Sequence, residues 1–187
     1  MNLYTLALFA HVSGAIGIFS GLGVWAFGVA ALRRARRVEQ VRLLAPLITA
    51  SSALVVSGVL ILGVAGFYMA LTAWGVTATW IIVATISFLL LAPGGLLILE
   101  RRMRAIAALA REAPDGSLPE TLAARTRDPL LATGLSVYIA CLFGIVFLMT
   151  NKPALSDAVT AILVAVALGL VVSLPLWRPR LKARSAS

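Results

Sequence analysis

The chain is poor in the residues that build most catalytic and metal centres. Its 187 residues include one cysteine, Cys141, and one histidine, His11. A single cysteine excludes an intramolecular disulfide and a zinc site made from paired cysteines. The sequence also lacks a Gly-rich phosphate loop, a Walker-type lysine and a nucleophile elbow, so we expect a role other than enzyme catalysis.

Acidic residues are few, and long stretches carry no charge at all. The chain has seven Asp or Glu residues against sixteen Lys or Arg residues, and no charged residue occurs between Arg42 and Glu100. Hydrophobic residues make up 61% of the chain, and the mean hydropathy is +1.01. This composition is typical of an integral membrane protein.

The apolar stretches predict membrane-spanning helices. A hydrocarbon core of about 30 Å needs roughly 20 apolar residues per helix. We predict an all-α fold, a polytopic membrane helical bundle of five transmembrane helices in a single domain covering residues 1–187. The segment 72–77, with its β-branched, Gly and Trp residues, separates the second helix from the third. The predicted spans are residues 2–32, 43–71, 79–99, 129–150 and 157–177.

The basic residues predict how this bundle is oriented. Lys152 stands apart from the other fifteen, which form three clusters that we place inside because cytoplasmic loops carry the Lys and Arg excess. The N-terminus is then outside and the C-terminus cytoplasmic. We expect anionic lipid headgroups on the cytoplasmic side as partners and no nucleic acid, because aromatic residues are not interleaved with the arginines. The clusters are Arg33, Arg34, Arg36, Arg37 and Arg42; Arg101, Arg102, Arg104, Arg111, Arg125 and Arg127; and Arg178, Arg180, Lys182 and Arg184.

The charged segment 100–128 predicts a cytoplasmic helical hairpin. We expect the third span to continue as a basic amphipathic helix along the inner membrane surface. Residues 113–116 would break that helix, and Ser117 with Glu120 has the spacing of a capping box that opens a short second helix. The apolar face of the first hairpin helix would contain Met103, Ile106 and either Leu109 or Ala110.

Small residues form one face of the first span, which we call the glycine ridge. At 100° per residue its members lie within about 60° of one another, and two of them form a GxxxG pair. Small residues allow a close approach by a second helix. The ridge could pack either another helix of the same bundle or a second copy of the chain. Its members are Ala10, Gly14, Gly17, Gly21 and Gly28.

His11 lies beside the glycine ridge, about 12 Å below the outer end of its helix. Ionisable groups inside membranes are rare, so His11 is a candidate haem or metal ligand, a proton carrier or a buried hydrogen-bonding group. Met69 and Met149 lie about 7–10 Å nearer the outer surface than His11. A haem would therefore need a dimer that pairs two copies of His11, a five-coordinate iron or a partner protein.

Two further features mark the spans and their connections. Pro93, Gly94 and Gly95 predict a kink in the third span, which either shapes the bundle or forms part of a transport site. Lys152 and Pro153 lie in the outer connection. Lys152 would hold an anion such as a haem propionate, lie at the surface, or pair with Asp157.

Four segments in order resemble a known family. They are LYTLALFAHVSGAIGIFSG, RRARR, SGVLILGVAGFYMALTAWGVTATWI and FLMTNKPAL. The chain resembles the uncharacterised bacterial membrane proteins grouped as domain of unknown function 2269, over nearly its whole length. The family's His-x-x-Gly-Ala pattern is matched by His11, Gly14 and Ala15, and its Lys-Pro pair by Lys152 and Pro153. The resemblance implies the fold and topology and brings no established activity.

These observations predict a bacterial inner-membrane protein that acts as a structural or accessory helical-bundle component of a homo-oligomer or a larger membrane complex. The first alternative is a haem-binding or redox membrane protein that uses His11. The second is a small-solute transporter hinging at Pro93, which ranks below the others because no acidic residue lies in the interior of any predicted span, Asp157 being at the outer end of the fifth.

Overall fold

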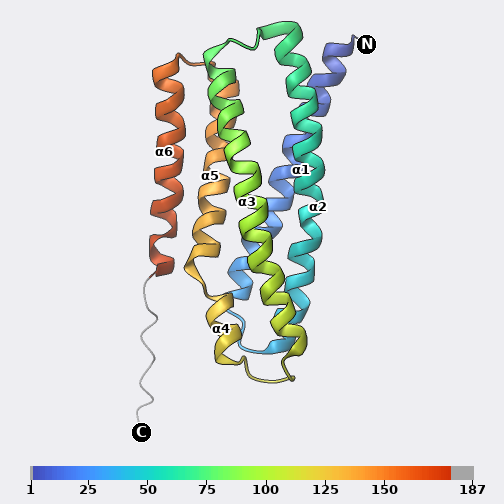
Figure 1. Ribbon diagram of the computed structural model, residues 1–187, viewed down its shortest axis with the longest axis vertical. Coiled ribbons are helices and arrows are strands. Elements are labelled where there is room, and N and C mark those ends of the chain that lie inside the picture. The colour runs from blue at the N-terminus through green and yellow to red at the C-terminus, as the bar shows by residue number, and fades with distance from the viewer. Residues whose placement is uncertain (1, 178–187) are drawn as a thin grey trace.

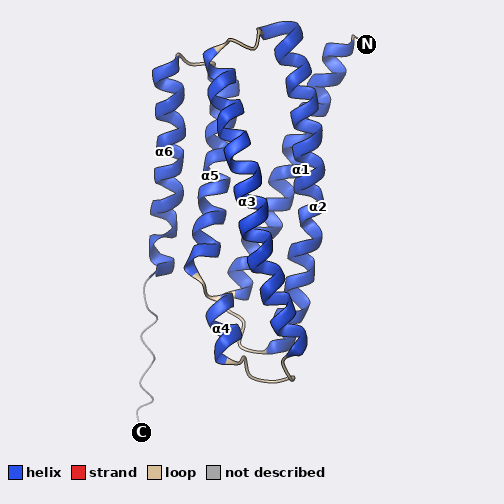
Figure 2. Ribbon diagram, viewed as in Figure 1, coloured by secondary structure: helices blue, strands red, loops and turns tan. Residues whose placement is uncertain are grey.

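The computed structural model describes residues 2–177, apart from the side chains of residues 92 and 94–96. The basic cluster at Arg178, Arg180, Lys182 and Arg184 therefore lies outside the described residues. Between residues 2 and 177 the chain is helical and contains no β-strand (Figure 2). The elements are α1 (Leu3–Leu32), α2 (Val38–Met69), the π-helix η1 (Ala70–Trp74), α3 (Thr79–Glu112), α4 (Glu120–Thr126), α5 (Pro129–Asn151), α6 (Leu155–Ser173) and the 3-10 helix η2 (Leu174–Trp177).

The long helices pack side by side into one bundle (Figure 1). α1 packs mainly on α2, α5 packs mainly on α6, and α3 contacts α2, α5 and α6. The N-terminal end of α1 and the connection from α5 to α6 lie at one end of the bundle. The connection from α1 to α2 and the short helix α4 lie at the other, which we call the α4 end. The prediction of an all-α helical bundle is confirmed.

Four helical segments are long and apolar enough to cross a membrane. They are Leu3–Leu32, Val38–Trp74, Glu120–Asn151 and Leu155–Trp177. The first part of α3, Thr79–Leu91, is a shorter apolar helix. The bundle is therefore that of an integral membrane protein, and the fifth span stays a prediction.

The helix formed by α2 and η1 is longer than the predicted second span. It begins at Val38, where the Gln40 side chain accepts hydrogen bonds from the backbone N–H groups of Arg36 at 2.8 Å and Arg37 at 3.2 Å. Helical structure continues through Trp74 and stops at Gly75, whose φ of 77° favours glycine. The first half of the predicted separator, residues 72–74, is therefore helical, and the turn begins at its glycine.

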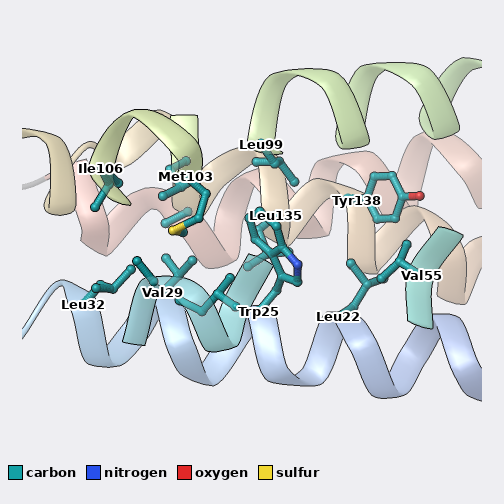
Figure 3. Close-up of a cluster of buried hydrophobic side chains, with 14 of the residues drawn as sticks. Leu22, Trp25, Val29, Leu32, Val55, Leu99, Met103, Ile106, Leu135 and Tyr138 are labelled. Carbon is teal, nitrogen blue, oxygen red and sulfur yellow. The ribbon is translucent and has the colours of Figure 1, made fainter. Parts of the chain in front are cut away.

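The buried side chains of α3 correct the prediction for the first hairpin helix. Met103, Ile106 and Ala110 form its apolar face as expected, and each is at most 1% exposed. Figure 3 shows that Met103 and Ile106 point toward side chains of α1 inside the bundle. The predicted position along the membrane surface is wrong, because this face packs against protein.

The lengths of α1 and α2 explain why α3 stays in the bundle. They contain 30 and 32 residues, or about 45–48 Å at 1.5 Å per residue, which exceeds a hydrocarbon core of about 30 Å. α2 is therefore long enough to offer α3 a protein surface over its whole length. α3 runs without interruption from Thr79 to Glu112 along it.

The connections at the α4 end pair with one another. The short helix α4 is confirmed, but the capping box is wrong: its N-cap is Pro119, with no side-chain hydrogen bond. Ser117 instead forms an antiparallel bridge with Arg37. In this bridge the Val38 N–H donates to the Gly116 carbonyl, and the Leu118 N–H donates to the Arg36 carbonyl, both at 3.0 Å. Two loops far apart in sequence thus hold each other.

Candidate functional site

His11 points from α1 toward α2. Its Nδ1 lies 3.1 Å from the backbone carbonyl oxygen of Leu62. The ring also covers Gly66, where a Cβ atom would lie 2.9 Å from the His11 Cε1 atom. Because a carbonyl oxygen can only accept, this hydrogen bond requires the proton on Nδ1 and leaves the lone pair of a neutral imidazole on Nε2. The sole histidine is thus part of the contact between α1 and α2.

The glycine ridge lies in the same contact. A Cβ on Gly14 would lie 2.8 Å from the Leu62 backbone nitrogen, and one on Gly21 would lie 2.6 Å from a methyl carbon of Val55. From the other side, a Cβ on Gly58 would lie 2.6 Å from the Gly14 carbonyl oxygen. The two backbones therefore approach too closely for larger residues at these positions.

The other ridge members contact α2 less uniformly. A Cβ on Gly28 would overlap the Ile48 side chain, at 2.4 Å from Cγ1, whereas one on Gly17 would make an ordinary contact of 3.5 Å with the Leu54 carbonyl oxygen. Ala10 is half-buried. The sequence left open whether the glycine ridge packs another helix of the same bundle or a second copy of the chain. In the structure it packs α2 of the same chain.

A carboxylate lies between α2 and α3 near the α4 end. Glu100 accepts a hydrogen bond of 2.8 Å from the Ser52 hydroxyl. It also forms an ion pair of 3.3 Å with Arg104, one turn further along α3. The Glu100 side chain is only 16% exposed. Ser52 was not singled out by sequence analysis, because its proximity to Glu100 depends on how α2 and α3 pack.

Several arginines that the sequence assigned to membrane orientation also bind backbone carbonyl groups. Arg33 donates to the carbonyls of Arg127 at 2.7 Å, Asp128 at 3.2 Å and Leu176 at 3.1 Å. It thereby joins the end of α1 to the turn before α5 and to η2. Helix C-termini leave carbonyl groups without helical donors, and a guanidinium supplies several at once.

Arg42 and Arg102 make comparable connections. Arg42, on α2, donates to the Ala110 carbonyl at 2.8 Å, to the Ala113 carbonyl and to the Asp115 carboxylate. Arg102 pairs with the Asp128 carboxylate, which also accepts from the Leu130 N–H at 2.9 Å and so caps α5. These bonds join α2, α3 and α5 at the α4 end.

Glu39 lies in the first turn of α2 at the same end of the bundle. Its carboxylate is 2.9 Å from the Arg37 guanidinium. The hydrogen bond from Arg37, supported by backbone N–H donors, lowers the pKa of Glu39 to about 2. The carboxylate also lies at a helix N-terminus, where negative charge is favoured.

The opposite end of the bundle carries an aromatic cluster, formed by Tyr4, Trp74, Trp80 and Lys152. Trp74 Nε1 donates to the Tyr4 hydroxyl oxygen at 3.3 Å, and the two tryptophan rings are 5.7 Å apart at an edge-to-face angle of 79°. The Lys152 ammonium lies 3.8 Å from the centre of the Trp74 ring, an attractive cation–π geometry. The cluster joins α1, η1, α3 and the end of α5.

This placement excludes one of the three interpretations of Lys152. Lys152 ends α5 in the left-handed region, with φ 49°, and half-buried Pro153 follows. Lys152 makes no ion pair with Asp157, which instead accepts a 3.4 Å hydrogen bond from the Ser156 hydroxyl. The pairing with Asp157, one of the alternatives, is therefore excluded, whereas a surface position is consistent with the exposed side chain. The cation instead closes the aromatic cluster.

Pro93 lies inside α3, which continues helically on both sides of it. Its side chain is exposed, and the surroundings of Gly94 and Gly95 lie outside the described residues. The kink therefore stays a prediction. Glu100, the nearest carboxylate along the chain, is already bound by Ser52 and Arg104.

The described residues contain no group of three or more His, Cys, Asp or Glu side chains that could hold a metal ion. Cys141 is buried in α5 as a free thiol. Among residues 2–177, the histidine nitrogen that is left to bind a cofactor is therefore Nε2 of His11.

A family model described as "Predicted integral membrane protein (DUF2269)" matches residues 5–153. The chain belongs to this family. The DUF2269 match extends from the first turn of α1 to the residue after Lys152, and the resemblance seen in the sequence is confirmed. It includes His11 and the glycine ridge, whereas α6 lies beyond it. No curated protein and no solved structure matches the chain.

Proposed function

We propose that this DUF2269 protein is a structural or accessory helical-bundle component of a homo-oligomer or larger complex in the bacterial cytoplasmic membrane. The observation that carries the proposal is that polar side chains within the helices bind groups on neighbouring helices. His11 binds the Leu62 carbonyl, and Ser52 binds Glu100. Each connects one long helix to another, as expected of groups that specify packing.

Two glycines support an assembly beyond the single chain. Gly23 on α1 and Gly63 on α2 have no atom within 4 Å of the position that a Cβ would occupy. Packing within the chain therefore does not require a glycine at either position. Next to Gly23, Ser20 and Phe27 are exposed on the same helix. A notch of small residues, Ser20 and Gly23, beside the exposed apolar Phe27 suits contact with a further membrane helix.

The assembly is tested by counting subunits of the full chain in lipid vesicles at low protein density, by single-molecule photobleaching. We expect more than one subunit per complex, or a partner that co-purifies stoichiometrically. Gly23→Leu should weaken the assembly. Gly63→Leu tests the corresponding open position on α2 in the same way. A monomer in lipid with no co-purifying partner contradicts the proposal.

The proposal includes five spans with the N-terminus outside and the C-terminus inside. The support is that the described residues of the first two basic clusters gather at the α4 end, whereas Lys152 lies at the other. Single cysteines at Ser117 and Ser156, both exposed, test this in a Cys141→Ser background. In intact cells a membrane-impermeant maleimide should label Ser156→Cys and spare Ser117→Cys. The reverse pattern inverts the orientation.

The tautomer of His11 favours one second candidate, a haem-binding or redox role. Donation by Nδ1 to a backbone carbonyl leaves Nε2 as the ligand atom, the arrangement usual for metal-bound histidines. The test is the visible spectrum of protein purified from its native membrane, before and after dithionite, beside His11→Ala. A Soret band that is lost in the variant supports haem. A colourless wild-type protein rejects this candidate.

A further inference from the structure

The bundle consists of two groups of helices, α1 with α2 and α3 with α5 and α6. At the α4 end, polar contacts join one group to the other. Arg33, at the end of α1, binds carbonyl groups in the turn before α5 and in η2. On α2, Arg42 binds the Ala110 carbonyl of α3, and Ser52 binds Glu100 of α3. The two groups are therefore firmly connected at this end.

α2 and α3 separate toward the opposite end. Ser52 and Glu100 meet at 2.8 Å. Eleven residues of α-helix are three full turns and about 20°, so Gly63 lies nearly in line with Ser52, and Leu89 with Glu100. No atom of the described residues lies within 4 Å of a Cβ on Gly63, and Leu89 is 62% exposed. The two helix faces that meet at Ser52 have thus parted about 16 Å further along.

The face of α1 that turns toward the second group shows the same change. Its residues Leu32, Trp25 and Ile18 follow one another at intervals of seven and are each at most 4% exposed. Figure 3 shows Trp25 and Leu32 pointing toward side chains of α3 and α5. The next two members of this series, His11 and Tyr4, are only half-buried. Packing between the groups is therefore dense near the α4 end and looser beyond Ile18.

The aromatic cluster connects the two groups again at the opposite end. The Lys152 ammonium lies 3.8 Å from the centre of the Trp74 ring, and the rings of Trp74 and Trp80 are 5.7 Å apart. Trp74 ends η1, which continues α2, whereas Lys152 ends α5, and both of these connections lie at the same end of the bundle (Figure 1). η1 is a π-helix, a rare element that is frequent at functional sites. The cation–π contact therefore joins one group of helices to the other.

The backbone of Lys152 is strained. Its φ of 49° and ψ of 52° lie in the left-handed region, which is unfavourable for residues other than glycine. Pro153 follows, and a proline favours an extended conformation in the residue before it. Strain of this kind persists only where the surroundings hold it, and it is concentrated at functional sites and switch regions. Release of the Lys152 side chain from Trp74 would allow the backbone to relax.

We propose that the contact between Lys152 and Trp74 is a latch. While it is made, the two groups of helices stay together at the end opposite α4. When it breaks, they separate there and turn about the polar contacts at the α4 end, which uncovers the half-buried face of α1 at His11. This motion does not depend on the accessory role proposed above.

The test is double electron–electron resonance on the spin-labelled full chain in lipid nanodiscs, in a Cys141→Ser background. The first label pair is Val64→Cys on α2 with Leu163→Cys on α6, both exposed and both in the half of the bundle near the aromatic cluster. We expect a main distance and a minor, longer one. The control pair near the α4 end, Leu43→Cys on α2 with Leu130→Cys on α5, should give a single distance.

Two variants separate the cation–π contact from other effects. Lys152→Met keeps a long side chain without the charge, and should raise the ratio of the longer to the shorter distance about two- to fivefold, the range for a cation–π contact at an exposed site. Lys152→Arg retains the contact and should match the wild type.

Three outcomes overturn the proposal. A longer distance that is absent both from the wild type and from Lys152→Met would show that this end does not open. An equal increase in Lys152→Arg would show that the cation–π contact does not hold it closed. An equal lengthening between the labels near the α4 end would indicate general loosening of the bundle.

Discussion

Arg33 donates a 2.7 Å hydrogen bond to the backbone carbonyl of Arg127, which lies 94 residues further along the chain. The same guanidinium reaches Asp128 and Leu176, so one side chain connects the end of α1 to the turn before α5 and to η2. Glutamine at this position is too short and has too few donors to make these bonds. The α4 end is therefore held by arginines that also set the charge asymmetry.

Arg33→Gln should destabilise the protein by about 2 kcal/mol, the typical value for hydrogen bonds to a charged group. The measurement is chemical or thermal unfolding of the purified protein in a mild detergent. Arg34→Gln is the control, since Arg34 is exposed and its replacement removes the same charge. Equal stabilities of the two variants would show that the Arg33 bonds contribute nothing beyond charge.

Gly58→Ala should destabilise the contact between α1 and α2 by about 1–3 kcal/mol, the usual cost of overpacking. Its Cβ would lie 2.6 Å from the Gly14 carbonyl oxygen and 2.9 Å from the Ile18 nitrogen, and backbone atoms cannot move aside cheaply. Gly23→Ala has open space and should be neutral or stabilising by up to about 1 kcal/mol. A tolerated Gly58→Ala contradicts the close approach.

The sequence predicts the local elements of this fold better than their partners. Uncharged runs locate the long helices, Gly75 marks the turn after η1, and the apolar spacing of Met103 and Ile106 identifies the buried face of α3. These features depend on neighbouring residues and on helical periodicity. They could be predicted because no distant contact is needed to produce them.

The contacts between helices were not predictable in the same way. Membrane helices are apolar on most faces, so composition does not reveal that α3 packs on α2 and α5 or that Ser52 meets Glu100. Lys152 had several plausible neighbours, and the approach of Trp74 depends on the π-helix that carries it. An arginine near the end of a membrane helix can orient the protein in the membrane or bind backbone carbonyl groups. The sequence alone suggested only the first of these roles for Arg33 and Arg42.

Glu39 should contribute to stability in a pH-dependent way. Its pKa falls from 4.5 to about 2 in the folded protein, chiefly through the hydrogen bond from Arg37. A lowered carboxyl pKa stabilises the fold above the unfolded-state value, and the contribution is lost as pH falls from about 4.5 to about 2. The unfolding midpoint of Glu39→Gln should lie below that of the wild type at pH 7 and converge with it in acid. A constant difference throughout this range would rule out the linkage.

Tyr138→Phe should leave the protein about as stable as the wild type. Tyr138 is only 3% exposed, and no hydrogen bond joins its hydroxyl to any described residue. Phenylalanine keeps the packed ring and removes only a hydroxyl that makes no hydrogen bond to the described residues, so little stability is lost. Unfolding midpoints in detergent compare the two proteins, with Tyr138→Leu as the control for lost ring packing. A clear loss of stability in Tyr138→Phe would show that the hydroxyl binds a group supplied from outside the chain.

His11→Phe separates the hydrogen bond of His11 from its packing. Phenylalanine retains a ring over Gly66 but cannot donate to the Leu62 carbonyl, which lies 3.1 Å from Nδ1 in the native protein. Hydrogen bonds between membrane helices contribute about 0.6 kcal/mol on average and at most about 1.7 kcal/mol. We therefore expect a stability loss within that range for His11→Phe and a larger loss for His11→Ala, which also exposes Gly66. Unfolding in detergent measures both. If His11→Phe is as stable as the wild type while the function of the native complex is lost, the Nε2 atom acts on a ligand, and the structural role alone is insufficient.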